Sequence, residues 1–225
     1  MALAVPDEIV ASPRLPQIVG ELTRLLEAEV SRRARFRDEL TDEIKAEFIN
    51  GEVIVHSPAR FAHLDVVGRL ASLLRAHASR RRLGVVTVEK QLVCLTRNDY
   101  EPDIAFFGVE KTRLFGPETR EFPAPDLVVE VLSESTAARD RGVKIEDYAA
   151  HGVSEYWIVD PDEPAVEQYL NAGDRFQLHR RVVLGDRLLS RILAGFDVPV
   201  AAVFRDDENP RALATIVGPL EAGNA

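Results

Sequence analysis

The stretch that most constrains the fold is residues 125–161, PDLVVEVLSESTAARDRGVKIEDYAAHGVSEYWIVDP. Its pattern predicts a strand, a polar turn, a short helix and a second strand. The first strand, LVVEVL, is rich in β-branched residues and bounded by proline and serine, which indicates burial on both faces. Glu130 is the one charge inside it, and burying an unpaired carboxylate is costly. We therefore expect Glu130 to hold a cation or a charged partner, unless the strand is less buried than its pattern indicates.

Composition limits the class of protein. The 225 residues are 46% hydrophobic and 29% charged, which suits one sizeable globular domain or a domain with terminal extensions. The apolar runs are too short to span a bilayer, so no membrane contact is expected, and the N-terminus shows no secretory signal. A single cysteine, Cys94, excludes internal disulfides. We expect a cytoplasmic protein in which Cys94 is a core residue rather than a nucleophile.

The net charge of −9 argues against a protein that coats nucleic acid nonspecifically, because phosphate neutralisation supplies much of that affinity. A contact with DNA limited to one site stays open. A cluster of carboxylates that binds a divalent metal would itself make the formal charge more negative.

Periodicity predicts an α/β chain. The expected elements are an irregular leader over residues 1–14, an amphipathic helix with a basic end over 15–40, a hairpin around Asn50-Gly51, a helix over 59–82, one long strand over 84–95, a strand over 101–108, and hairpin strands over 165–170 and 175–179. The 15–40 helix suits docking on the body or on a second subunit better than a nucleic-acid contact. We place an N-terminal extension at 1–40, the main domain at 41–205, and a polar, loose tail at 206–225.

Two strands that read as buried each contribute one acid, Asp103 and Glu130. If these strands are neighbours, their carboxylates approach closely, and two like charges repel unless one is protonated or a hard cation lies between them. Carboxylate oxygens with remaining water positions suit Mg²⁺ or Mn²⁺.

Asp140, Lys144 and Tyr148 recur every four residues on the helix that follows Glu130. If this helix packs over the strand end, Lys144 points toward the two acids, where a lysine can position or activate an attacking water and neutralise a phosphate oxygen. Such a set suits phosphodiester hydrolysis. Spacing alone does not separate this interpretation from a surface Asp140–Lys144 pair. A lone histidine such as His63 is more often a packed or capping residue than a ligand.

Several motifs together resemble the Uma-type restriction endonuclease family of the PD-(D/E)XK nuclease superfamily: GEVIVHSPARFAH, YEPDIAFFG, PDLVVEVLSEST, RDRGVKIEDYAAHGV and SEYWIVDP. The resemblance covers residues from about 48 to 204. It implies a restriction-endonuclease-like mixed central β-sheet flanked by helices, with the first 40 residues as a helical extension outside it.

The resemblance also implies roles for single residues. Asp103 and Glu130 would be the metal-binding acids, and Glu47 the acid contributed by an earlier element. The lysine usually found two residues after the second acid is replaced by Leu132, and Lys144 would be the relocated lysine. His63 and Tyr148 also occupy positions that the family pattern favours, as accessory residues.

The leading hypothesis is therefore a Mg²⁺- or Mn²⁺-dependent endonuclease that acts on DNA and forms a homodimer. A catalytically inactive DNA-binding or protein-interaction module is the alternative, which the acidic charge and Leu132 favour. An RNA or nucleotide substrate is a third hypothesis.

Overall fold

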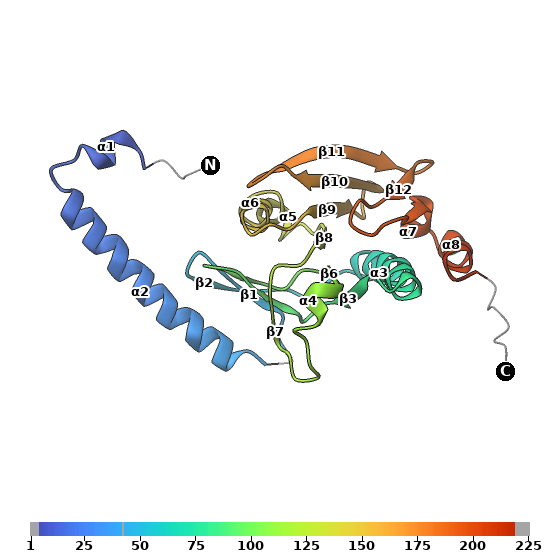
Figure 1. Cartoon of the computed structure of the whole chain (residues 1–225), viewed down its shortest axis with the longest axis horizontal. Helices are drawn as coiled ribbons and strands as arrows, with labels where there is room; N and C mark the ends of the chain where they lie inside the picture. The colour runs from blue at the N-terminus through green and yellow to red at the C-terminus, as the bar shows by residue number, and fades with distance from the viewer. Residues whose placement is uncertain (1–4, 42, 219–225) are drawn as a thin grey trace. The chain divides into compact units, whose positions relative to one another are not determined.

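The structure is a computed structural model that describes residues 5–41 and 43–218 (Figure 1). The chain separates into two compact units. The first unit consists of Met1–His56 and Thr96–Tyr100, and the second of Ser57–Leu95 and Glu101–Ala225. The predicted domain boundaries near residues 40 and 205 stay predictions.

The first unit is built from one long helix and a small antiparallel sheet. Its elements are α1 (Asp7–Val10), α2 (Leu15–Glu39), β1 (Ala46–Ile49), β2 (Glu52–Val55) and β5 (Asp99–Tyr100), with β1 paired to both β2 and β5. Asn50 and Gly51 adopt φ of 51° and 87°, as the predicted tight turn requires. The predicted 15–40 helix and the hairpin are both confirmed.

A buried aspartate fixes the C-terminal half of α2 to this sheet. The guanidinium groups of Arg33 and Arg37 both donate to the Asp99 carboxylate, over distances of 2.5 to 2.9 Å. Next to this ion pair, the rings of Phe36 and Phe48 lie 5.8 Å apart. Bidentate arginine pairs are strong and directional, so they set the orientation of the helix as well as its attachment.

The second unit is a mixed sheet with helices on both faces. The strands of the large sheet are β3 (Gly84–Val88), β6 (Ile104–Gly108), β8 (Leu127–Val131), β9 (Glu155–Asp160), β10 (Ala165–Asn171) and β11 (Phe176–Val183). Their order is β11-β10-β9-β8-β6-β3, in which β8 and β9 are parallel and the other pairs antiparallel. This confirms the predicted α/β class with a mixed sheet flanked by helices.

Smaller elements complete this unit. The helices are α3 (Phe61–Arg81), α4 (Val109–Thr112), α5 (Ala137–Asp140), α6 (Val143–Ala150), α7 (Ala201–Phe204) and α8 (Glu208–Val217). Two strand pairs lie outside the large sheet: β4 (Leu92–Cys94) with β7 (Glu121–Phe122), and β12 (Arg187–Leu189) with β13 (Asp197–Pro199). In the part of the chain that the structure describes, no helix is long and apolar enough to cross a membrane.

Strand β8 is buried on both faces, as its sequence predicts. Leu127, Val129 and Val131 join the apolar core beneath α3. Val128 and Glu130 point to the opposite face, which α6 covers through a contact between the rings of Tyr148 and the neighbouring strand's Tyr156. Trp157 is fully buried in the α3-side core.

Two predicted elements are interrupted in the structure, and two predicted strands have other bounds: the strand expected over 101–108 is β6 (Ile104–Gly108), and that expected over 175–179 is β11 (Phe176–Val183). The strand expected over residues 84–95 is interrupted, because Glu89 and Lys90 both adopt left-handed φ of 49° and 56°, which ends β3. The helix expected to carry Asp140 and Lys144 together is split at Gly142 into α5 and α6. A Cβ at Gly142 would lie 2.8 Å from the Ala138 carbonyl oxygen, so the close approach of the two helical segments requires glycine.

The chain ends are more ordered than predicted. The expected irregular leader contains α1, which begins after Pro6 with two acids in its first turn. Residues 208–217 of the expected loose tail form α8, because Ala212 packs into the core and the Asn209 amide donates to the Ala202 and Arg69 carbonyl oxygens. The predictions for residues 1–4 and 219–225 lie outside the described residues. Cys94, expected in the core, is half-buried.

Replacing Asp99 by Asn should destabilise the protein by about 3 to 5 kcal/mol, because Arg33 and Arg37 then lose the carboxylate that neutralises them. The measurement is the free energy of unfolding in urea at pH 7. Asp197→Asn removes the exposed ion pair with Arg187 and is the matched control, expected to cost about 1 kcal/mol or less. Equal losses for the two variants would contradict the anchoring role of Asp99.

The stability that Asp99 contributes should depend on pH. Burial raises the pKa of Asp99, but the hydrogen bonds and charges of Arg33 and Arg37 outweigh it, so the pKa lies below its ordinary value. A lowered pKa stabilises the fold fully above the unfolded value of about 3.9 and is lost as the pH falls through the folded value. The stability difference between wild type and Asp99→Asn should therefore be constant at pH 5 to 7 and shrink below about pH 4.

Candidate functional site

Three acids occupy equivalent ends of three neighbouring strands in the second unit. Glu89 directly follows β3, Asp103 directly precedes β6, and Glu130 lies near the end of β8. The register pairs Val88 with Ile104, so Glu89 comes opposite Asp103, and the Glu89 N–H donates to the Asp103 carbonyl oxygen at 3.2 Å. Because Ile104 pairs with Val129, one further step along the ladder sets Asp103 opposite Glu130.

The Asp103 carboxylate is held from two sides. Its Oδ2 accepts a hydrogen bond of 2.8 Å from the backbone N–H of Val131, the residue after Glu130. Its Oδ1 lies 3.4 Å from His63 Nε2, which the first turn of α3 supplies. Asp103 and His63 are both buried. The neighbouring strand and the helix together fix where the carboxylate points.

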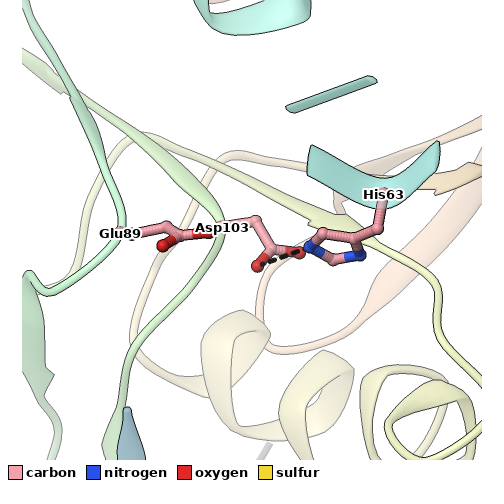
Figure 2. Close-up of side chains that lie close together, drawn as sticks. All are labelled: His63, Glu89 and Asp103. Carbon is pink, nitrogen blue, oxygen red and sulfur yellow. Dashed lines mark ion pairs between the residues drawn. The ribbon is translucent and has the colours of Figure 1, made fainter. Parts of the chain in front are cut away.

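Asp103, Glu89 and His63 form a group that fits a divalent cation. Each offers one ligand atom, and these atoms all lie within 4.8 Å of one another. Figure 2 shows the Asp103 side chain between the other two, with Glu89 on one side and the imidazole on the other. Carboxylates suit Mg²⁺ and Mn²⁺, whereas an imidazole suits softer transition metals, so this mixed set of donors matches a divalent metal by its chemistry.

A buried lysine lies on the other side of Glu130. The Lys144 ammonium donates to Glu130 Oε1 at 3.2 Å and lies 3.1 Å from Asp140 Oδ1. All three side chains are almost completely buried. A buried lysine needs paired anions to offset its desolvation, and here one comes from β8 and one from the helical turn before α6. Lys144 is thus fixed in place.

Residue Glu130 joins these two clusters. Its carboxylate contacts Lys144, while the backbone directly after it holds Asp103. In the described part of the chain, Glu130 is not among the His63–Glu89–Asp103 group that lies within 4.8 Å. The predicted role of Glu130 as a metal ligand therefore stays a prediction, as does that of Asp103.

The other predicted site residues lie in separate surroundings. Tyr148 is one turn after Lys144 on α6 and is fully buried against Tyr156. Glu47 lies in β1 of the first unit, where its Oε2 is 3.0 Å from Nε2 of His56. Their catalytic or accessory roles stay predictions.

Sequence reasoning missed Glu89. In a continuous strand it reads as an ordinary polar position, and only the left-handed backbone at Glu89 and Lys90 shows that the strand ends there. Such strained conformations of residues other than glycine are enriched at functional sites. A signal was present in the register, since pairing the two strands around Val88 and Ile104 would have placed Glu89 opposite Asp103.

Comparison with known proteins shows the family and the fold of the chain. Residues 32–201 match the model of the Uma2 family, described as "Putative restriction endonuclease". The chain belongs to this family. Among solved structures, a protein of Anabaena variabilis, titled as a putative nuclease belonging to DUF820, superposes with a TM-score of 0.63. That match covers 75% of this chain and 94% of the other at 18% identity, so it shows a shared fold. No match was found among curated proteins.

Membership of the Uma2 family confirms the predicted resemblance, and the shared fold agrees with the predicted restriction-endonuclease-like sheet. The family match begins within α2, so most of the N-terminal helix precedes it. The matched residues include Glu47 in the first unit and the strand ends of the large sheet in the second. Family and fold together indicate a nuclease of the restriction endonuclease type.

Removing one carboxylate from the three-residue group should weaken Mn²⁺ binding. Changes to residues that only support a ligand typically cost 10- to 100-fold in affinity, so Glu89→Gln should cost at least about tenfold. Isothermal titration calorimetry with Mn²⁺ measures the effect, and Glu118→Gln, an exposed acid of the same unit, is the control. Unchanged affinity in Glu89→Gln would remove Glu89 from the site.

Proposed function

We propose that this protein is a divalent-metal-dependent endonuclease that hydrolyses DNA phosphodiester bonds, using Mg²⁺ or Mn²⁺. The observation that carries the proposal is the meeting at β8 of a carboxylate–imidazole group and a buried lysine. Family membership and the shared fold support the nuclease class. The choice of DNA, the metal requirement and the roles of individual residues belong to the proposal.

The metal would be held by Asp103 and Glu130, the predicted ligands, with Glu89 and His63 completing the donor set. When bound, a divalent ion stabilises negative charge on a phosphate and lowers the pKa of water. Asp103 is suited to this role because the Val131 N–H already orients one of its oxygens and leaves the carboxylate directed at His63 and Glu89. A site oriented in advance needs little rearrangement during the reaction.

Lys144 would act on the DNA phosphate from its position beside Glu130. Its ammonium can donate to the attacking water or to a non-bridging phosphate oxygen, and so stabilise the charge that develops in the transition state. Glu130 and Asp140 would hold the ammonium in position through their ion pairs. Lys144 thereby takes the part of the lysine that the superfamily pattern places at Leu132. Glu47 would assist as a further acid, with His63 and Tyr148 as accessory residues.

A second candidate is a catalytically inactive module that binds DNA or protein. Leu132 at the usual lysine position and the formal net charge of −9 both favour it. RNA or a nucleotide is a further candidate substrate for the same residues.

We place the protein in the cytoplasm. We also propose that it acts as a homodimer, since cleavage of both strands of a duplex commonly uses two active sites.

The test is cleavage of supercoiled and linear duplex DNA with Mg²⁺ or Mn²⁺, compared with EDTA. Asp103→Asn and Lys144→Met should each lower the rate by about 10²- to 10³-fold, because each removes a group that stabilises transition-state charge. Lys111→Ala removes a lysine that pairs with Asp126 instead, and serves as the matched control with an unchanged rate.

Equal rates in wild type and Lys144→Met would reject the lysine assignment. Absence of cleavage in every metal, together with metal-independent DNA binding, would favour the inactive module. Cleavage of RNA but not DNA would redirect the substrate class.

A further inference from the structure

The N-terminal half of α2 extends beyond the rest of the first unit. The hairpin turn packs against the middle of the helix, where Arg32 Nε donates to the Gly51 carbonyl oxygen at 3.1 Å. The buried residues of α2 are Glu29, one turn before this contact, and Phe36, one turn after it. Residues 15–28 of the helix contain no buried residue.

Those turns nevertheless carry large apolar side chains. Val19, Leu22, Leu25, Leu26 and Val30 are each between 50% and 68% exposed. Isolated exposed apolar residues are normal, but a contiguous set marks an interaction surface.

Four of these residues form one stripe along the helix. Val19, Leu22, Leu26 and Val30 follow the spacing of three, four and four residues that places side chains on one face. The stripe contains no charged residue. A partner can therefore cover it without burying a charge.

We propose that this stripe, Val19–Leu22–Leu26–Val30, pairs two copies of the chain, α2 against α2, antiparallel about a two-fold axis near the middle of the stripe. Such an axis sets Leu22 beside Leu26 of the second copy, so that each stripe buries the other. A self-complementary patch of this kind closes at two subunits and leaves no surface for further growth.

The stripe can form the apolar centre of a dimer interface. With half or more of each side chain exposed, its four residues offer roughly 400 Å² per subunit, about half of the roughly 800 Å² per partner in a standard stable interface. Polar residues flanking the stripe supply the remainder in ordinary interfaces.

Charge argues against a membrane as the occupant. A helix that lies on a membrane surface carries lysine and arginine on its polar face. Here residues 15–31 of the helix carry Glu21, Glu27 and Glu29 with one basic residue, Arg24. Helix α1 adds Asp7 and Glu8. This local acidity opposes anionic lipid and nucleic acid alike, whereas a second copy needs only the apolar stripe.

This α2–α2 interface would hold together the proposed endonuclease homodimer. Only the purpose of the dimer rests on the proposed function, since the stripe itself does not depend on it. The experiment is sedimentation equilibrium of the full chain from about 1 to 100 µM. Wild type should be dimeric, and Leu22→Glu with Leu26→Glu should weaken dimerisation at least about 100-fold, since two buried leucines per copy are lost. Leu114→Glu with Leu178→Glu, exposed apolar residues of the second unit, is the matched control and should stay dimeric.

A monomeric wild type at 100 µM, or an unaffected dimer in Leu22→Glu/Leu26→Glu, would overturn the proposal. Because charge at these helix positions is tolerated by the fold, circular dichroism should show native helix content in both double variants. Flotation with phosphatidylserine–phosphatidylcholine vesicles that depends on Leu22 and Leu26 in a monomeric protein would overturn it in favour of a membrane. Cleavage by an obligate monomer would reject the pairing and keep the nuclease, whereas a dimer inert toward DNA would do the reverse.

Discussion

The constraint on which the second unit depends is the burial of charge on strand β8. Glu130 lies in a strand covered on both faces, so its carboxylate needs a cation. Lys144 supplies one from α6, and the lysine in turn requires Asp140 as a second anion. This requirement explains why a helix that follows the strand folds back over its end. The same backbone segment then fixes Asp103 through the Val131 N–H, so the charge network and the candidate metal group share one support.

The first unit follows the same logic in a different place. Asp99 is buried beneath two arginines of α2, and this attachment leaves the N-terminal half of the helix extending past the hairpin. Buried charge thus determines where each helix attaches. In one unit it builds a candidate site, and in the other it leaves an apolar stripe available for a second chain.

Much of the fold could be predicted from local pattern, because strand alternation and helical spacing are local properties. The hairpin at Asn50-Gly51 and the buried strand β8 are examples. Which strands are neighbours is not a local property, so the approach of Asp103 to β8 could be expected only on the condition that the two strands pair. Glu89 was missed because the left-handed backbone that ends β3 has no sequence signature without glycine, and the register that sets Glu89 opposite Asp103 depends on the same strand pairing. The order of α8 was also missed, because its burial depends on α3, whose Arg69 lies 140 residues before Asn209 in the sequence.

The sequence indicated the kinds of residue in the candidate site, acids and a lysine, better than it indicated which residues lie together. Spacing left a surface Asp140–Lys144 pair open, and the family resemblance favoured Lys144 beside the acids. In the structure its ammonium lies 3.2 Å from Glu130 Oε1. The structure groups Asp103 with Glu89 and His63, however. The central question is therefore which residues bind the metal. The most direct measurement is anomalous diffraction from crystals soaked in Mn²⁺. We expect one manganese peak within coordinating distance of the Asp103 carboxylate, with Glu89 and His63 or Glu130 as further ligands. A fully occupied peak elsewhere, or none at millimolar Mn²⁺, would contradict it.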